Sequence, residues 1–142
     1  MPVATRPTHP SPHRGRAPVP ALVFGLVGGP AAWFIQLLVS SGLGQEACYP
    51  KAVPLSAPAF AGLATVLPVM EVAAILVALA AALTAYVCWR RSRGERAGDG
   101  HSLVDIGEGR SRFMAMAGIL TSLGFAGAIL FTLPAILAVR GC

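Results

Sequence analysis

Residues 66–89 read VLPVMEVAAILVALAAALTAYVCW, an apolar run in which Glu71 is the only charged side chain. A helix that crosses the roughly 30 Å hydrocarbon core of a bilayer needs about 20 mostly apolar residues, because each residue adds about 1.5 Å of length. The run meets this length, so it predicts a membrane-spanning helix.

Two further apolar runs lie on either side of it. Residues 21–43 contain no charged side chain, and residues 113–139 lie between Arg112 and Arg140, as expected for charges at the two headgroup layers. The first run exceeds the roughly 7 to 15 residues of a signal-peptide core, and no clear small-x-small cleavage site follows it. This favours a retained helix, although cleavage would leave two spans. The predicted fold is an all-α membrane protein with three transmembrane helices.

The composition agrees with a chain that lies mostly in lipid. Of the 142 residues, 55% are hydrophobic and only 12% are charged, unlike an ordinary soluble domain. The net charge of +5 does not indicate nucleic-acid binding, because the basic residues are not gathered with polar or aromatic readers on one folded face. We expect the lipid bilayer, and no nucleic acid, as a partner.

The distribution of basic residues predicts the orientation. Short loops rich in Arg and Lys stay in the cytoplasm. Only Lys51 and Arg140 lie on one side of the predicted spans. The other side holds Arg6, Arg14, Arg16, Arg90, Arg91, Arg93, Arg96, Arg110 and Arg112. A cytoplasmic N-terminus and a periplasmic C-terminus follow, in a multi-pass protein of the bacterial inner (cytoplasmic) membrane.

The segments outside the predicted spans are expected to be tails and connecting loops. Residues 1–20 are basic and rich in proline without apolar periodicity, which predicts a disordered cytoplasmic tail. Residues 44–65 form a periplasmic loop, and residues 90–112 form a charged, glycine-containing cytoplasmic connection. Residues 140–142 end on the periplasmic side.

This topology separates the three cysteines. Cys48 and Cys142 fall on the periplasmic side, where disulfides persist, whereas Cys88 lies at the inner end of the second span. We therefore predict a disulfide between Cys48 and Cys142 and a packing role for Cys88. The alternatives are two free thiols, or a thiol or copper carrier on the periplasmic face. A copper site would need further soft ligands, and of the methionines only Met70 lies on that side.

Glu71 is the one ionisable side chain within a predicted span, and such groups are functional candidates by default. At about 1.5 Å per residue it stands about 27 Å from Trp89, close to the outer interface. Its depth favours an interfacial, solvated carboxylate over a group that handles a proton or pairs with an ion. A proton relay would also need a second buried acid, which the spans lack.

Other residues of the spans predict helix packing. Gln36 will seek a hydrogen-bond partner on a neighbouring helix, because lipid offers none. Small residues at four-residue spacing lie on one face of each helix, where they allow close approach, either within a three-helix bundle or to another protein. These residues are Gly25, Gly29, Ala74, Ala78, Ala82, Gly118, Ser122 and Ala126.

The segments Gly29-Pro30-Ala31-Ala32-Trp33 and Arg112-Phe113, together with Gly118, Pro134 and the two outer cysteines, carry a family resemblance. The chain resembles a poorly characterised group of three-span bacterial membrane proteins encoded near haem-copper cytochrome c oxidase genes, over nearly all of its membrane part. The resemblance implies an accessory or assembly role beside a terminal oxidase, and it carries over no catalytic residue. Glu71 is not part of the group's pattern.

We therefore expect a non-catalytic accessory subunit or assembly factor of a larger inner-membrane complex, with a respiratory oxidase as the expected partner. An enzyme is disfavoured because no nucleophile and base pair, metal-ligand cluster or phosphate-binding loop can be assembled from the sequence, and no cofactor is expected. A second hypothesis is a small homo-oligomeric transporter or channel component that works through Gln36 and Glu71.

Overall fold

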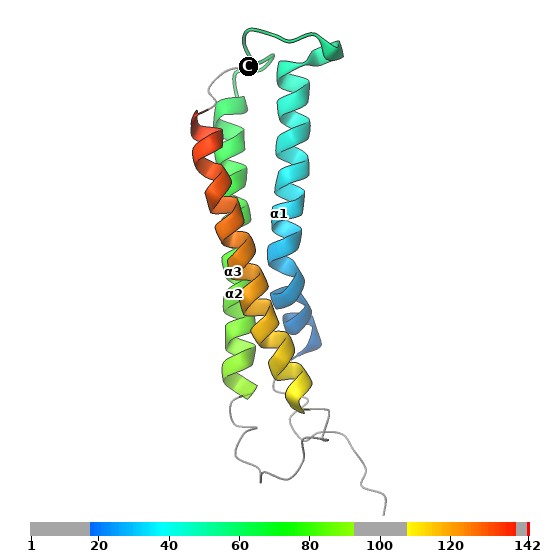
Figure 1. Ribbon diagram of the computed structural model, residues 1–142, viewed down its shortest axis with the longest axis vertical. Helices are drawn as coiled ribbons and strands as arrows, with labels where there is room; N and C mark the ends of the chain where they lie inside the picture. Colours follow the sequence, from blue (N-terminus) through cyan, green and yellow to red (C-terminus); the bar gives the residue numbers. More distant parts are fainter. Residues whose placement is uncertain (1–17, 93–107, 139–141) are drawn as a thin grey trace, which may run out of the picture.

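The computed structural model describes residues 18–92, 108–138 and 142, and within these residues it holds three long α-helices and no strand. The helices are α1 (Val19–Cys48), α2 (Leu63–Arg91) and α3 (Glu108–Ala138), and a short 3-10 helix, η1 (Pro50–Ala52), follows α1. They run alternately up and down the long axis of the molecule (Figure 1). All three are long and apolar enough to span a membrane, as the sequence predicts.

The helices extend beyond the apolar runs that predict them. Helix α1 continues past residue 43 to Cys48, and α2 begins at Leu63, so both ends of the predicted loop 44–65 are helical. Helical hydrogen bonding can continue past the apolar run, which is why hydropathy alone does not place a helix end. Most of the predicted tail 1–20, of the loop 90–112 and of the end 140–142 lies outside the described residues.

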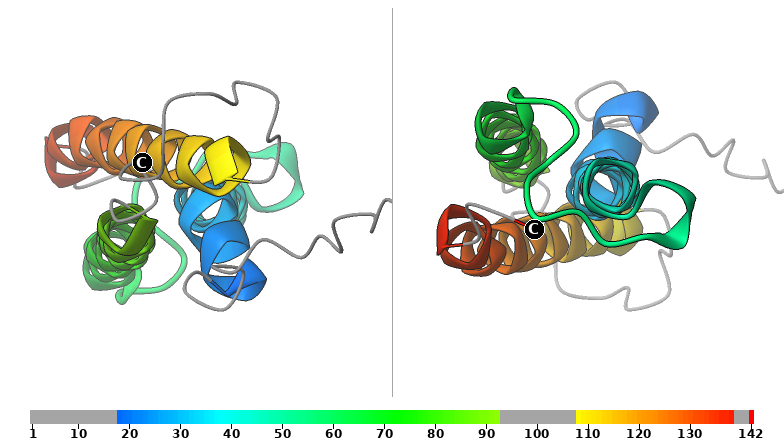
Figure 2. Two further views of the ribbon diagram at one scale, coloured as in Figure 1. Left: turned by 90° about the horizontal axis from the view of Figure 1, so that it is seen from below. Right: turned by 90° about the horizontal axis from the view of Figure 1, so that it is seen from above.

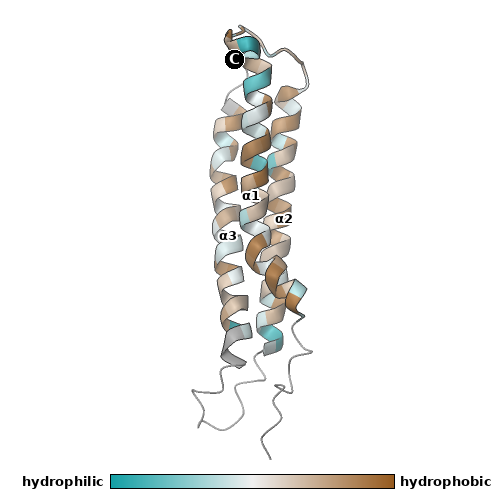
Figure 3. Ribbon diagram, turned by 90° about the vertical axis from the view of Figure 1, so that its right-hand side faces the viewer, coloured by the Kyte–Doolittle hydropathy of each residue, from teal (hydrophilic) through white to brown (hydrophobic). Residues whose placement is uncertain are grey.

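The three helices form a bundle in which each helix contacts the other two (Figure 2). Its interior is built mainly from small side chains, and large apolar side chains such as Phe34, Leu76 and Phe131 are exposed on the outside. Figure 3 shows hydrophobic residues along most of each helix and hydrophilic ones mainly near the helix ends. Such an inside-out distribution suits lipid, where close van der Waals packing replaces the hydrophobic effect between helices.

The connection from α1 to α2 is folded back on the end of α1. The Leu55 amide donates to the Cys48 carbonyl at 2.8 Å, and the Ala59 amide donates to the Ala47 carbonyl at 2.9 Å. Within η1, Lys51 and Ala52 have positive φ angles of 57° and 61°. The connection is therefore tied to the end of α1 at this end of the bundle, which we call the disulfide end because Cys48 and Cys142 lie there.

The opposite end carries basic and aromatic side chains together. The Arg112 guanidinium lies 5.8 Å from the centre of the Trp89 ring, and the Arg90 guanidinium lies 5.9 Å from that of Tyr86. Cation–π contacts of this kind hold a charge beside an aromatic face. Aromatic rings and Arg at a helix end are typical of a membrane interface.

Candidate functional site

A cluster of three polar side chains, one from each helix, lies inside the bundle towards the disulfide end; two of them are buried and the third is half-buried. It consists of Gln36 from α1, Glu71 from α2 and Thr132 from α3, and we call it the polar cluster. The Gln36 amide nitrogen donates to one Glu71 carboxyl oxygen, and the Thr132 hydroxyl lies 3.3 and 3.4 Å from the two carboxyl oxygens. Glu71 is 0% exposed and Gln36 is 6% exposed. Hydrogen bonds to one carboxyl group thus join all three helices.

The expectation of a solvated Glu71 is wrong, because the carboxyl group is fully buried. The depth of a residue along a helix gives its height in the membrane, but the helix face on which it lies decides whether it meets solvent. Glu71 lies on the face of α2 that turns towards the other two helices. That face is marked by the buried residues Ala74, Ala78, Ala81, Ala85 and Cys88, which follow Glu71 at spacings of three and four.

The hydrogen-bond donors and acceptors of the polar cluster can pair with Glu71 in either of its two protonation states. The Thr132 hydroxyl has one hydrogen, and its oxygen lies 2.7 Å from the Ile129 carbonyl oxygen as well as close to Glu71. When Glu71 is a carboxylate, it accepts from both Gln36 and Thr132. When Glu71 is an acid, its own hydrogen can go to the Thr132 oxygen while Thr132 donates to Ile129. A rotation of one hydroxyl therefore serves both states.

No basic side chain neutralises Glu71 in the part of the chain that the structure describes. The described Lys and Arg side chains lie in the loop after α1 and at the other end of the bundle, namely Lys51, Arg90, Arg91 and Arg112. The second amide hydrogen of Gln36 points towards Ser40, whose hydroxyl oxygen lies 3.5 Å away. The direct partners of the carboxyl group are thus neutral hydrogen-bonding groups.

The half of the bundle away from the disulfide end is packed backbone against backbone. A methyl group added at Gly25 would lie 2.8 Å from the Ala85 side chain, and one added at Gly29 would lie 2.6 Å from the Ser122 Cα. One added at Gly118 would lie 3.0 Å from the backbone of Gly25. These distances are shorter than ordinary carbon contacts of about 3.5 to 4.0 Å, so only glycine fits. Gly25, Gly29, Gly118 and Ser122 meet inside the bundle. Ala74, Ala78 and Ala126 pack together in it, and Ala82 is buried as well.

Two hydroxyls of α3 lie beside carbonyls of α1 in the turn that precedes Pro30. Proline has no amide hydrogen, so the carbonyl of Leu26, four residues earlier, loses its helical partner. The Thr121 hydroxyl of α3 lies 3.4 Å from this carbonyl oxygen and closer, at 2.9 Å, to the Ala117 carbonyl oxygen of its own helix. The neighbouring Ser122 hydroxyl donates to the Gly25 carbonyl at 2.7 Å. Side-chain hydroxyls of α3 thus contact backbone carbonyls of α1 where these two helices lie close together.

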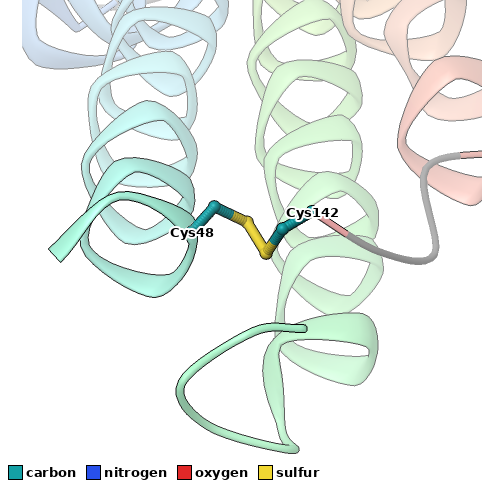
Figure 4. The surroundings of a disulfide bond; sticks show 2 residues. All are labelled: Cys48 and Cys142. Atoms are coloured by element: carbon teal, nitrogen blue, oxygen red, sulfur yellow. A yellow bond between two sulfur atoms is a disulfide. The ribbon is translucent and has the colours of Figure 1, made fainter. Parts of the chain in front are cut away.

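The predicted disulfide joins Cys48 at the end of α1 to Cys142 (Figure 4). Their Cα atoms are 5.4 Å apart, a usual distance for a disulfide. Because the two sulfur atoms are bonded to each other, neither thiol is free in this state to bind copper. Cys88 is a free, buried cysteine on the packed face of α2. Within the described residues, no three His, Cys, Asp or Glu side chains come together.

Sequence reasoning missed Thr132 and two glycines of α3. Thr132 is three residues after the buried Ile129, so the spacing of the α3 core face includes it. A methyl group added at Gly124 or Gly127 would have no atom within 4 Å, unlike one added at Gly118. Their three-residue spacing falls outside the four-residue pattern used to find packing faces.

Comparison of the chain with protein-family models, with curated proteins and with solved structures found no match.

Proposed function

We propose that this chain is a non-enzymatic membrane protein whose functional group is Glu71, which takes up and releases a proton inside the helix bundle. The observation that carries the proposal is the complete burial of Glu71 between hydrogen-bonding side chains of the two other helices. A carboxylate charge inside a membrane is costly unless a proton or a cation neutralises it. The described neighbours supply no cation, which favours a proton.

Infrared spectroscopy of the protein in lipid tests this proposal. A protonated carboxyl group has its own C=O stretching band, which disappears when the group loses its proton. We expect a band that appears and disappears reversibly with pH in the wild type and is absent from Glu71→Gln. Glu46→Gln is the matched control, because Glu46 lies exposed at the end of α1, and it should keep the band. A wild-type spectrum identical to that of Glu71→Gln at every pH would contradict the proposal.

The outer face of α3 favours a second candidate function, that of an accessory subunit in a larger membrane complex. Gly124 and Gly127 leave an open shallow surface, and Leu120, Leu130 and Phe131, all exposed, flank it. Exposed glycines between large apolar side chains let another helix approach closely. The small residues predicted from the sequence are used within the bundle, so this face is the one that supports a partner. The family resemblance favours a respiratory oxidase as that partner.

Capture of the tagged protein from its native membrane, after gentle crosslinking, tests the accessory role. We expect oxidase subunits in fixed proportion with the wild type and a loss of them with Gly127→Leu, which fills the open surface. Ala80→Leu is the matched control, since Ala80 is exposed on α2, and it should keep the partner. Recovery of this chain alone would contradict the accessory role and favour the homo-oligomeric transporter.

We further infer that the disulfide end faces the periplasm and that the protein lies in the bacterial inner membrane. Disulfides persist in oxidising compartments, whereas Arg-rich ends of membrane helices stay in the cytoplasm. The disulfide and the Arg side chains lie at opposite ends of the bundle, so the two rules agree. Reaction of a thiol probe with Ser56→Cys from the cytoplasmic side of the membrane would contradict this orientation.

A further inference from the structure

A cavity of about 690 Å³ lies between the polar cluster and the disulfide end of the bundle. Its described walls come from all three helices and the loop, and include Cys48 of α1, Pro58 of the loop, Ala64, Leu67 and Pro68 of α2, and Ala135 of α3. Pro68 precedes Glu71 by three residues, and Ala135 follows Thr132 by three residues. Residues at this spacing lie on the same face of a helix. The cavity therefore lies about one helical turn from the polar cluster.

Pro68 also leaves a polar atom in the wall of this cavity. Because proline has no amide hydrogen, the carbonyl of Ala64 cannot accept the usual hydrogen bond from residue 68. Helix carbonyls point towards the C-terminal end, so this oxygen is directed along α2 towards Glu71. A water molecule takes up about 30 Å³ of liquid, so the cavity has room for several. It thus offers both space and a hydrogen-bond acceptor next to the buried carboxyl group.

The other side of the polar cluster is closed. There the helices are in backbone contact, and methyl groups added at Gly25, Gly28 or Gly29 would meet α2 or α3 at 2.6 to 2.8 Å. A groove of about 680 Å³ between α1 and α2 does reach Gln36 from the side, but Gln36 is its only polar described lining residue. Almost all of its wall is apolar, whereas backbone atoms give the cavity at the disulfide end more polar surface, although the described lining side chains of that cavity are apolar too. Water therefore suits the cavity better than the groove.

We propose that the cavity is a water-filled vestibule through which protons reach Glu71 from the disulfide end alone. The proposal rests on the proposed function, in which Glu71 exchanges a proton. A vestibule on one side and packed backbones on the other make the site one-sided in this conformation. Cys48 lies in the vestibule wall, which places the disulfide at its outer edge.

Thiol labelling tests the vestibule in the intact protein. In a Cys88→Ala background, single cysteines are introduced and exposed to a positively charged, membrane-impermeant methanethiosulfonate reagent on the disulfide side of proteoliposomes. Leu67→Cys lies in the vestibule wall and should be labelled. Ala78→Cys, buried on the closed side, and Leu76→Cys, exposed to lipid, should not be labelled. Peptide mapping confirms that the Cys48–Cys142 disulfide is intact in each variant.

Ser56→Cys, in the exposed loop at the disulfide end, is the positive control for the reagent. Labelling of Ser56→Cys without labelling of Leu67→Cys would overturn the vestibule. Labelling of Ala78→Cys at the same rate as Leu67→Cys would overturn its one-sidedness.

A second measurement connects the vestibule to Glu71. Modification of Leu67→Cys should slow the exchange of deuterium into the Glu71 carboxyl group, read from the infrared band. An unchanged exchange rate after complete modification would place the proton route elsewhere and overturn the proposal. Labelling depends only on water in the cavity, and the band depends only on Glu71. A failed vestibule is therefore distinguishable from a failed proposed function.

Discussion

Substitution of Gly29 by alanine should destabilise the bundle, because the added methyl group has no room. An ideal Cβ at Gly29 would lie 2.6 Å from the Ser122 Cα and 3.0 Å from its hydroxyl oxygen. An ordinary carbon contact requires about 3.5 Å, so α1 and α3 must separate by about 1 Å at this point. The near neighbour is backbone, which cannot move aside as a flexible side chain does.

The magnitude follows from three contributions. Overpacking by one methyl group costs about 1 to 3 kcal/mol. Separation of the helices also stretches the 2.7 Å hydrogen bond from Ser122 to Gly25, and an interhelical hydrogen bond in a membrane contributes about 0.6 kcal/mol on average. The higher helix propensity of alanine offsets up to about 1 kcal/mol. The expected net loss of unfolding free energy is about 1 to 3 kcal/mol.

Gly124→Ala is the matched control, because a methyl group there has no atom within 4 Å. It adds only helix propensity, so it should be neutral or stabilising by up to about 1 kcal/mol. Reversible unfolding of both variants in mixed micelles of mild and denaturing detergent, with the disulfide intact, measures the two free energies. If Gly29→Ala unfolds within about 0.5 kcal/mol of Gly124→Ala, close backbone packing does not hold this half of the bundle together.

Three further predictions concern the hydrogen bonds and the disulfide. Ser122→Ala should lower the unfolding free energy by about 0.6 to 1.7 kcal/mol in the same assay, and an unchanged value would show that the Gly25 carbonyl finds another partner. Cys48→Ser should lower it by about 2 to 4 kcal/mol, and a reductant should then destabilise the wild type but leave the variant unchanged. In a double-mutant cycle, Gln36→Leu and Glu71→Leu should show a coupling energy of about 0.6 to 1.7 kcal/mol, whereas additive effects would argue against a direct hydrogen bond.

The three helices could be predicted from the sequence because the bilayer imposes a length. Each apolar run is long enough to cross hydrocarbon, and few other structures can satisfy the backbone there. The helix ends were less predictable, since α1 runs on through the polar residues Gln45 and Glu46. Outside the hydrocarbon, hydropathy no longer distinguishes a helix from a loop.

The disulfide was predictable because topology restricts the choice. Only Cys48 and Cys142 fall on the same side of the predicted spans, so one pairing satisfies the compartment rule. Cys88 needed no partner, and the structure places it on the packed face of α2. The predicted topology therefore allows only one pairing among the three cysteines.

The burial of Glu71 was missed for a geometric reason. The height of a residue along a helix gives its depth in the membrane, but it does not give the direction in which the side chain points. The small residues Ala74, Ala78 and Ala81 follow Glu71 at alternating spacings of three and four residues. This spacing places them on the same helix face as Glu71, so the sequence does indicate the direction of its side chain. The partners Gln36 and Thr132 follow only when the three helices are set at a common height, which a single sequence does not supply.

The disulfide also bears on how the protein is made. Cys142 follows α3, so its thiol can meet Cys48 only after the third helix has been threaded across the bilayer in the correct direction. A chain whose last helix stalls or inserts backwards keeps two unpaired thiols on opposite sides of the membrane. The covalent bond can thus form only in a chain whose third helix has completed its insertion.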